Sequence, residues 1–309
     1  EEGMSEPESY VRIWKDGRRE KLPIQRPRRQ SSSTQPATEA HAVIAKIREA
    51  AARLNLKHPM AVWPEALPEK IYLPDVLNDY LTGGWDGQDW RLCKKWGDET
   101  TTRDFVYPYL GMKDLPSKQK QLPLQADTAQ GGNMLIFGSS ATGKSTMMRT
   151  LAVSLALTNS PSEVNLYILD YGGQASLKIL EAFPHVGAIA TRIESERTER
   201  LIQLIRTEIL IRNEKLRNAN VDNWIDYNAT VPDALKLPAL YLLIDSFGNL
   251  RQSFEIEFID QVSSLLNGGQ SAGLFMIISS SLQSDVPNDL FANINFRLTF
   301  LQADSTEYF

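Results

Sequence analysis

The segment with the clearest chemical signature runs from residue 138 to residue 146. It follows a short apolar run, residues 133–137 (NMLIF), and matches the pattern G-x-x-x-x-G-K-[ST]. Glycines let the backbone curl so that N–H groups face inward around an anion, and the lysine adds a positive charge for the β- and γ-phosphates. The alternative is a glycine-rich turn that caps a helix. The pattern predicts a Walker A loop that binds ATP through Gly138, Ser139, Ser140, Ala141, Thr142, Gly143, Lys144, Ser145 and Thr146.

A second signature is an aspartate at the end of an apolar run, residues 239–245 (ALYLLID), which is typical of a Walker B strand. Ligands of open α/β sheets bind at the carboxyl ends of the strands, where Asp245 would lie. Hydroxyl and carboxylate oxygens are ligands that Mg²⁺ accepts. We therefore expect Ser145 and Asp245 to hold Mg²⁺, and Asp245 is also the first candidate catalytic residue.

The residue that follows Asp245 leaves open whether the site hydrolyses ATP. Many ATPases place a glutamate directly after this aspartate to polarise the attacking water, and here the residue is Ser246. A hydroxyl cannot act as that base. Asp170, at the end of residues 163–170, is a candidate substitute, and the alternative for it is a structural or switch carboxylate.

The elements that must position these residues alternate between strand and helix from residue 131 onward. Short apolar runs predict strands at 133–137, 163–170, 239–245, 274–279 and 296–301, and amphipathic spacing predicts helices at 144–157, 194–217 and 256–266. Apolar strands separated by helices indicate a parallel sheet covered on both faces. The predicted class is α/β, a RecA-like P-loop NTPase with a mostly parallel central sheet flanked by helices and a smaller N-terminal extension.

The chain before residue 131 has a different character, and we expect three regions. Residues 1–36 are a tail and a linker rich in Pro, Ser, Thr and Gln, residues 37–130 form a helical and irregular extension packed on the core, and residues 131–309 form the ATPase core. Apolar residues at helical spacing predict a helix at 38–54. We expect four tryptophans to pack the extension rather than bind a ligand, namely Trp63, Trp85, Trp90 and Trp96.

Composition narrows the function classes. The 309 residues include 33 Lys and Arg and 38 Asp and Glu, a net charge of −5, which argues against indiscriminate nucleic-acid binding. The single cysteine, Cys93, excludes an internal disulfide, and the three histidines do not have metal-ligand spacing. No apolar run reaches the roughly 18 residues of a membrane-spanning helix. Because Met4 is internal, we expect a fragment of a longer protein.

Several segments together resemble the FtsK/SpoIIIE ATPases and, more closely, a P-loop domain of the EssC/EccC family of type VII secretion systems. The segments are FGSSATGKST, YILDYGGQASLKILEAFPHVGAIAT, YLLIDSFGNLR, SAGLFMIISS and ANINFRLTF, preceded by IYLPDVL and YLGMKDLPSKQKQLPLQ. The resemblance covers residues 60–309. It departs from the DNA translocases at residues 280–283, which read SSLQ where those proteins carry Thr-Gln-Arg-Pro.

The resemblance implies an ATP-binding domain of a secretion motor, at the cytoplasmic side of a bacterial membrane and part of a longer membrane-anchored chain. It implies neighbouring ATPase domains and secreted helical proteins as partners. Later domains of this family bind ATP with degenerate catalytic residues, and Ser246 fits that class. Arg297 lies in a matching segment and is a candidate for acting on a neighbouring domain's nucleotide, with a local ion pair as the alternative.

Two other functions remain as alternatives. One is a DNA translocase motor, although the chain is acidic and shows no winged-helix module. The other is an interaction module that ATP stabilises without turnover, which the serine at position 246 favours.

Overall fold

The computed structural model describes residues 10–13, 19–22, 39–56, 65–95, 108–126, 132–173, 176–294 and 296–302. The chain divides into two units, residues 1–61 and 62–309. The first unit contains an antiparallel hairpin of β1 (Tyr10–Ile13) and β2 (Arg19–Leu22), and the helix α1 (Glu39–Arg53). Residues 23–36 of the expected tail and linker lie outside the described residues.

The helix predicted at 38–54 is confirmed as α1, but it belongs to the first unit rather than to the extension in which we placed it. None of its side chains is buried, and the apolar Val43 and Ile47 are both more than half exposed. The spacing of apolar residues predicted the helix correctly because it reflects local periodicity. It did not predict the unit to which the helix belongs, because spacing carries no information on which element the apolar face contacts.

The first part of the second unit consists of one helix and two antiparallel hairpins. They are α2 (Leu73–Tyr80), β3 (Leu81–Trp85) with β4 (Trp90–Lys95), and β5 (Tyr109–Leu115) with β6 (Lys120–Gln125). Val76, Leu81 and Tyr109 form a small core of their own. The rings of Trp85 and Trp90 pack together at 4.4 Å between centroids, whereas Trp63 and Trp96 lie outside the described residues.

The core of the second unit is a six-stranded sheet in the order β12-β7-β11-β10-β8-β9, in which all neighbouring strands are parallel. The five predicted strands are confirmed, and the structure adds β9. The bounds are β7 (Met134–Phe137), β8 (Val164–Asp170), β9 (Val186–Thr191), β10 (Ala239–Asp245), β11 (Leu274–Ser280) and β12 (Phe296–Thr299). β9 was not predicted because this edge strand, VGAIAT, is rich in alanine and glycine and lacks a run of large apolar side chains.

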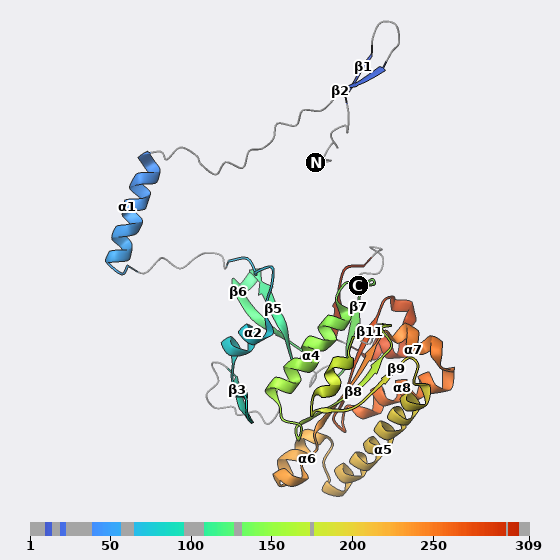
Figure 1. Ribbon diagram of the computed structural model, residues 1–309. Helices are drawn as coiled ribbons and strands as arrows, with labels where there is room; N and C mark the ends of the chain where they lie inside the picture. Colours follow the sequence, from blue (N-terminus) through green and yellow to red (C-terminus); the bar gives the residue numbers. More distant parts are fainter. Residues whose placement is uncertain are drawn as a thin grey trace. The chain divides into compact units, whose positions relative to one another are not determined.

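Helices cover both faces of this sheet (Figure 1). α4 (Lys144–Thr158) lies on one face, and α5 (Ser195–Ala219) and α8 (Ile256–Gly269) lie on the other. The three predicted helices of the core are thereby confirmed. The shorter helices are α6 (Trp224–Thr230), α7 (Phe247–Ser253) and α9 (Asn288–Asn293). Among the described residues, no helix combines the length and the apolar character that crossing a bilayer requires.

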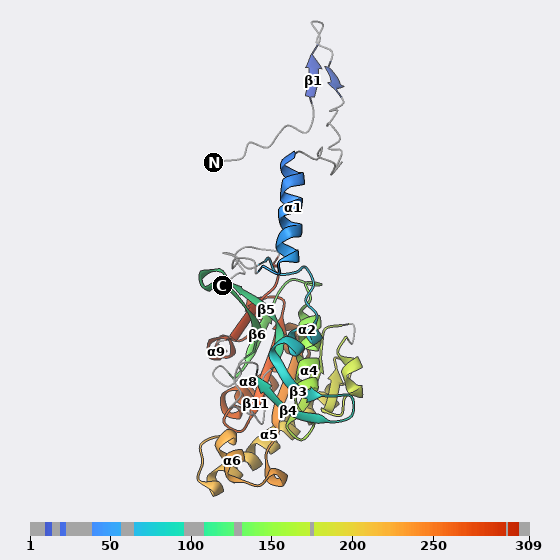
Figure 2. The same cartoon turned by 90° about the vertical axis from the view of Figure 1, so that its left-hand side faces the viewer.

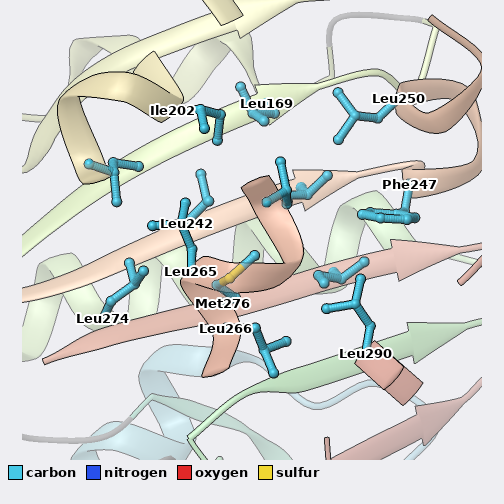
Figure 3. Close-up of a cluster of buried hydrophobic side chains, with 14 of the residues drawn as sticks. Leu169, Ile202, Leu242, Phe247, Leu250, Leu265, Leu266, Leu274, Met276 and Leu290 are labelled. Atoms are coloured by element: carbon cyan, nitrogen blue, oxygen red, sulfur yellow. The ribbon is translucent and has the colours of Figure 1, made fainter. Parts of the chain in front are cut away.

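Side chains of the central strands alternate between two apolar cores. Leu242 packs with residues of α5, α7 and α8 on one face, and Leu243 packs with residues of α4 on the other. Figure 3 shows the first core, where Leu242, Met276 and Leu265 meet. Every residue of β10 and β11 is buried, because helices cover both faces of the sheet. Both strands are accordingly apolar up to the last residue of β10 and the last two residues of β11.

The part of the second unit that precedes β7, called the extension from here on, packs against α4 through β3, β4 and β5, so this helix is covered on its second side as well (Figure 2). The backbone N–H of Tyr109 donates to the hydroxyl of Ser154, at 2.8 Å, in a buried contact. Seven of the fifteen residues of α4 are buried. The helix that carries the Walker A loop is therefore held between sheet and extension.

Candidate nucleotide site

The Walker A loop connects β7 to α4, as the sequence predicted. Its backbone takes the left-handed conformation at Ala141 (φ 62°) and at Gly143 (φ 106°), directly before α4 begins at Lys144. A Cβ at Gly138 would lie 2.6 Å from the hydroxyl of Thr142 and 2.8 Å from Cβ of Phe300, so only glycine fits there. The loop thus curls tightly at the N-terminus of a helix, where backbone N–H groups and the helix dipole favour an anion.

The lysine of the loop folds back over it. Nζ of Lys144 donates to the carbonyl oxygens of Gly138 at 2.6 Å and Ser139 at 2.9 Å, and the Thr142 hydroxyl donates to Ser139 at 2.8 Å. Burial lowers the pKa of the Lys144 ammonium group, and the nearby charge of Asp245 opposes that shift. A partly buried cation of this kind gains from a bound phosphate, because the anion replaces water that the lysine has lost.

Ser145 and Asp245 meet although they lie 100 residues apart in the chain. The Ser145 hydroxyl donates to Oδ2 of Asp245 at 2.7 Å, and the aspartate is 1% exposed at the end of β10. A Cβ at Gly172 would overlap Oδ2, so this glycine leaves room beside the carboxylate. Two hard oxygen donors in contact fit Mg²⁺, whose remaining ligands are commonly phosphate and water.

Asp170 lies opposite Asp245, in register on the neighbouring strand β8. Its Oδ2 accepts from the N–H of Leu177 at 2.9 Å, its Oδ1 accepts from the N–H of Gly172 at 3.3 Å, and the side chain is 3% exposed. Burial raises the pKa of Asp170, the hydrogen bond from Leu177 opposes this, and the charge of Asp245 adds to it. Both oxygens hold the loop that follows β8, and the catalytic role of Asp170 stays a prediction.

Ser246 is the first residue after β10 and precedes α7. Its backbone is left-handed (φ 63°), and its N–H donates to the hydroxyl of Ser279 at 2.8 Å. The position that carries a glutamate in many ATPases therefore offers a short, half-buried hydroxyl. The site can therefore bind and orient a nucleotide, but position 246 supplies no carboxylate to polarise the attacking water.

Arg297 contacts its own domain. Its Nε donates to the carbonyl oxygen of Ile294 at 2.9 Å, its Nη2 donates to that of Phe291 at 2.8 Å, and the guanidinium carbon lies 3.9 Å from the Phe291 ring centre. Cations at a helix C-terminus are favourable, so these contacts give Arg297 a local role at the end of α9. They are made to carbonyl oxygens and a ring, and the local ion pair that we weighed stays a prediction. Its action on a neighbouring nucleotide stays a prediction.

Two residues near the metal ligands were not singled out from the sequence. The Ser279 hydroxyl donates to Oδ1 of Asp245 at 2.5 Å, and Gly172 leaves space beside Oδ2. The available signal was a polar residue at the carboxyl end of an apolar strand, since LFMIIS ends in serine at the same edge as Asp245. Serines are common at strand ends, however, and that signal alone does not select one.

The fold and the site define a P-loop ATPase of the α/β class. The P-loop strand β7 and the aspartate strand β10 are separated by β11, and the loop, the lysine and the aspartate meet at the carboxyl edge of the sheet. The FtsK/SpoIIIE family model matches residues 107–307, and the chain belongs to that family. The resemblance and the fold class expected from the sequence are thereby confirmed.

Individual relatives point to type VII secretion. The chain is 26% identical over 271 residues to the type VII secretion system protein EssC of Staphylococcus aureus strain MRSA252, covering 87% of this chain and 17% of that protein. It is similar to the solved cytoplasmic domain of the Thermomonospora curvata type VII secretion ATPase EccC, with a TM-score of 0.69, 27% identity and coverage of 82% and 29%. It is also similar to ATPases 2 and 3 of that EccC in complex with a signal sequence peptide, with a TM-score of 0.67, 26% identity and coverage of 80% and 44%.

Proposed function

We propose that this chain is an ATP-binding domain of a type VII secretion motor, and that residues 138–146 bind Mg·ATP. The observation that carries the proposal is the 2.7 Å contact between Ser145 and Asp245 at the N-terminus of α4. It brings the residues of two separate motifs into one site that suits a metal-bound phosphate. The likeness to EssC and EccC supports the secretion role.

Each group in the site has a separate task in this proposal. The backbone N–H groups of the loop bind the phosphates, and Lys144 leaves the loop carbonyls to contact the β- and γ-phosphates. Ser145 and Asp245 hold Mg²⁺, which when bound neutralises charge between those phosphates. The left-handed turn at Gly143 keeps the loop N–H groups pointing at the ligand.

The proposed partners follow from the relatives. A solved structure of EccC ATPases 2 and 3 contains a signal sequence peptide, and the protein named there has several ATPase domains. We infer that this domain works beside neighbouring ATPase domains and contacts helical segments of exported proteins. The proposed location is the cytoplasmic side of a bacterial membrane, in a longer membrane-anchored protein of which the chain spans a part.

The second candidate is an interaction module that ATP stabilises without turnover. Two observations favour it: Ser246 follows the aspartate, and both oxygens of Asp170 are engaged by backbone N–H groups. A DNA translocase has less support, because the net charge of −5 is unfavourable for nucleic acid and the relatives described above are secretion proteins.

Calorimetry with ATP and Mg²⁺ tests the site. Lys144→Ala should weaken binding by about 2–3 kcal/mol, the scale of a hydrogen bond to a charged group, which is roughly 30- to 150-fold in Kd. Lys118→Ala is the matched control, since this lysine is exposed in the extension. Equal affinities for wild type and Lys144→Ala would refute the assignment.

The motor role needs a second experiment in the full-length parent protein. Lys144→Ala should reduce export of the helical substrates, whereas Lys118→Ala should leave export unchanged. Undiminished export with a loop that no longer binds ATP would contradict a motor role for this domain.

A further inference from the structure

Two adjacent serines end β11, and the alternation of the strand points them in opposite directions. Both are fully buried. The hydroxyl of Ser280 turns away from the site, where its single proton has two acceptors within reach, the carbonyl oxygen of Leu282 at 3.1 Å and the carboxylate of Asp285 at 3.0 Å. The hydroxyl of Ser279 turns toward Asp245. The pair therefore offers a test residue and a matched control next to each other.

The Ser279 hydroxyl makes two hydrogen bonds whose directions are determined. It carries one proton, which it donates to Oδ1 of Asp245 at 2.5 Å, and its oxygen accepts from the N–H of Ser246 at 2.8 Å. The other carboxylate oxygen, Oδ2, accepts from Ser145 at 2.7 Å. Asp245 is thus held between two serines, one from α4 and one from β11, with one on each carboxylate oxygen.

We propose that Ser279 is the residue that positions Asp245 for Mg²⁺ and couples the metal site to the start of α7. The inference rests on the proposed function, because it concerns the same site. With Oδ1 bound to Ser279, the carboxylate has one orientation, and Oδ2 faces Ser145 and the space beside Gly172. A ligand that is already oriented loses less conformational entropy when the metal binds.

The coupling to α7 runs through Ser246. A left-handed conformation is unfavourable for a residue other than glycine and must be held by surrounding contacts. The N–H of Ser246 is held by the same hydroxyl that holds Asp245, and α7 begins at the next residue. Within α7, Asn249 donates to the carbonyl oxygen of Tyr171 at 2.9 Å, which links the helix to the loop after β8. A change in the contacts of Asp245 therefore reaches α7 through one side chain.

The test compares ATP affinity with Mg²⁺ and with the metal chelated, for wild type, Ser279→Ala, Ser279→Thr and Ser280→Ala. The ratio of the two dissociation constants is the Mg²⁺ enhancement. Ser279→Ala should lower it by about tenfold, the scale of one hydrogen bond to a charged group, and change metal-free affinity by less than about twofold. Ser279→Thr, which keeps the hydroxyl, should restore most of the enhancement, and Ser280→Ala should retain it.

A second readout needs no nucleotide. Hydrogen exchange of the amides of residues 246–253 should be faster in Ser279→Ala than in wild type, and Ser279→Thr, which keeps the hydroxyl that holds the N–H of Ser246, should restore most of the protection. If Ser279→Ala does not fold, Ser279→Cys replaces it, since a thiol is a weaker donor of similar shape and should lower the enhancement partly.

The outcomes separate this inference from the proposed function. Wild type without any Mg²⁺-dependent ATP binding would overturn both. Mg²⁺-dependent binding in wild type that Ser279→Ala or Ser279→Cys retains in full would overturn the role of Ser279 alone. A loss of the enhancement in Ser280→Ala equal to that in Ser279→Ala would also overturn it, because the effect would then come from general loosening of β11.

Discussion

The indole N–H of Trp90 donates a 2.7 Å hydrogen bond to the backbone carbonyl oxygen of Ala156. Ala156 is among the last four residues of α4, whose carbonyl groups have no partner within the helix. The Trp90 ring also contacts His185 edge-on, at 5.3 Å between centroids. One side chain of the extension thus completes the end of the helix whose beginning carries the Walker A loop.

Removing that contact should loosen the nucleotide domain. Trp90→Phe keeps an aromatic ring but loses the N–H, and should lower the free energy of unfolding by about 1 kcal/mol. Trp90→Ala also loses packing and should cost about 2–4 kcal/mol. Urea unfolding measures both. Tyr72→Phe is the control, because this side chain is 62% exposed, and an equal loss in Tyr72→Phe and Trp90→Phe would contradict the role of the hydrogen bond.

Asp245→Asn should separate metal binding from phosphate binding. The change removes a charged metal ligand, so the gain in ATP affinity on adding Mg²⁺ should fall. Metal-free affinity should stay equal or rise, since a negative charge near the triphosphate disappears. Calorimetry with and without a chelator measures the ATP affinity in the absence and in the presence of Mg²⁺. Asp289→Asn is the control, because Asp289 is exposed. If Mg²⁺ raises affinity by the same factor in wild type and Asp245→Asn, then Asp245 does not hold the metal.

The stability of the domain should fall in mild acid because of His185. This histidine is 2% exposed, its Nε2 is bonded to the carbonyl oxygen of Asn159 at 2.8 Å, and its Nδ1 has no partner. Burial lowers the pKa of His185, and the hydrogen bond to Asn159 and the charge of Glu163 oppose this only in part. The unfolded chain therefore takes up the proton more readily, and the stability present above pH about 6.5 is lost as pH falls below it.

Denaturant unfolding between pH 8 and pH 5 tests this for wild type and His185→Phe. The variant should be less stable at pH 8, and the difference between the two proteins should narrow toward pH 5. Asp170, whose pKa is raised by burial, is present in both proteins and cancels from the difference. A difference that stays constant over this range would show that His185 does not titrate on unfolding.

ATP turnover by this chain should be slow, below about one per second, the low end of typical enzyme values. Ser246→Glu should raise the rate, because a positioned base typically contributes 10²–10⁴-fold, although the gain in an isolated domain should be at the lower end. Ser246→Gln, which has a similar size and no charge, should not. Steady-state assays measure all three. A faster wild type would show that another residue supplies the base.

The central elements of the fold were predictable because their signals are contiguous. The runs that become β8, β10 and β11 are mostly apolar, since strands in the middle of a parallel sheet are buried on both faces. The edge strand β9 lacks that signal, because VGAIAT is partly exposed and has small side chains. The hairpins of the extension were not predicted for a related reason: the described residues of β5 and β6 are mostly not buried, so these strands lack a continuous apolar run.

In the site, too, residues that are contiguous in the sequence were predictable, whereas contacts between distant residues were not. The Walker A residues 138–146 are consecutive and carry their own geometry, so the sequence alone predicted them and the nucleotide class. The contacts of Asp245 with Ser145 and Ser279, and of Trp90 with Ala156, depend on which strands are neighbours and in what register they pair. Those pairings join residues 34 to 100 positions apart, and only the packing of the whole domain decides them because no local pattern encodes such a distance.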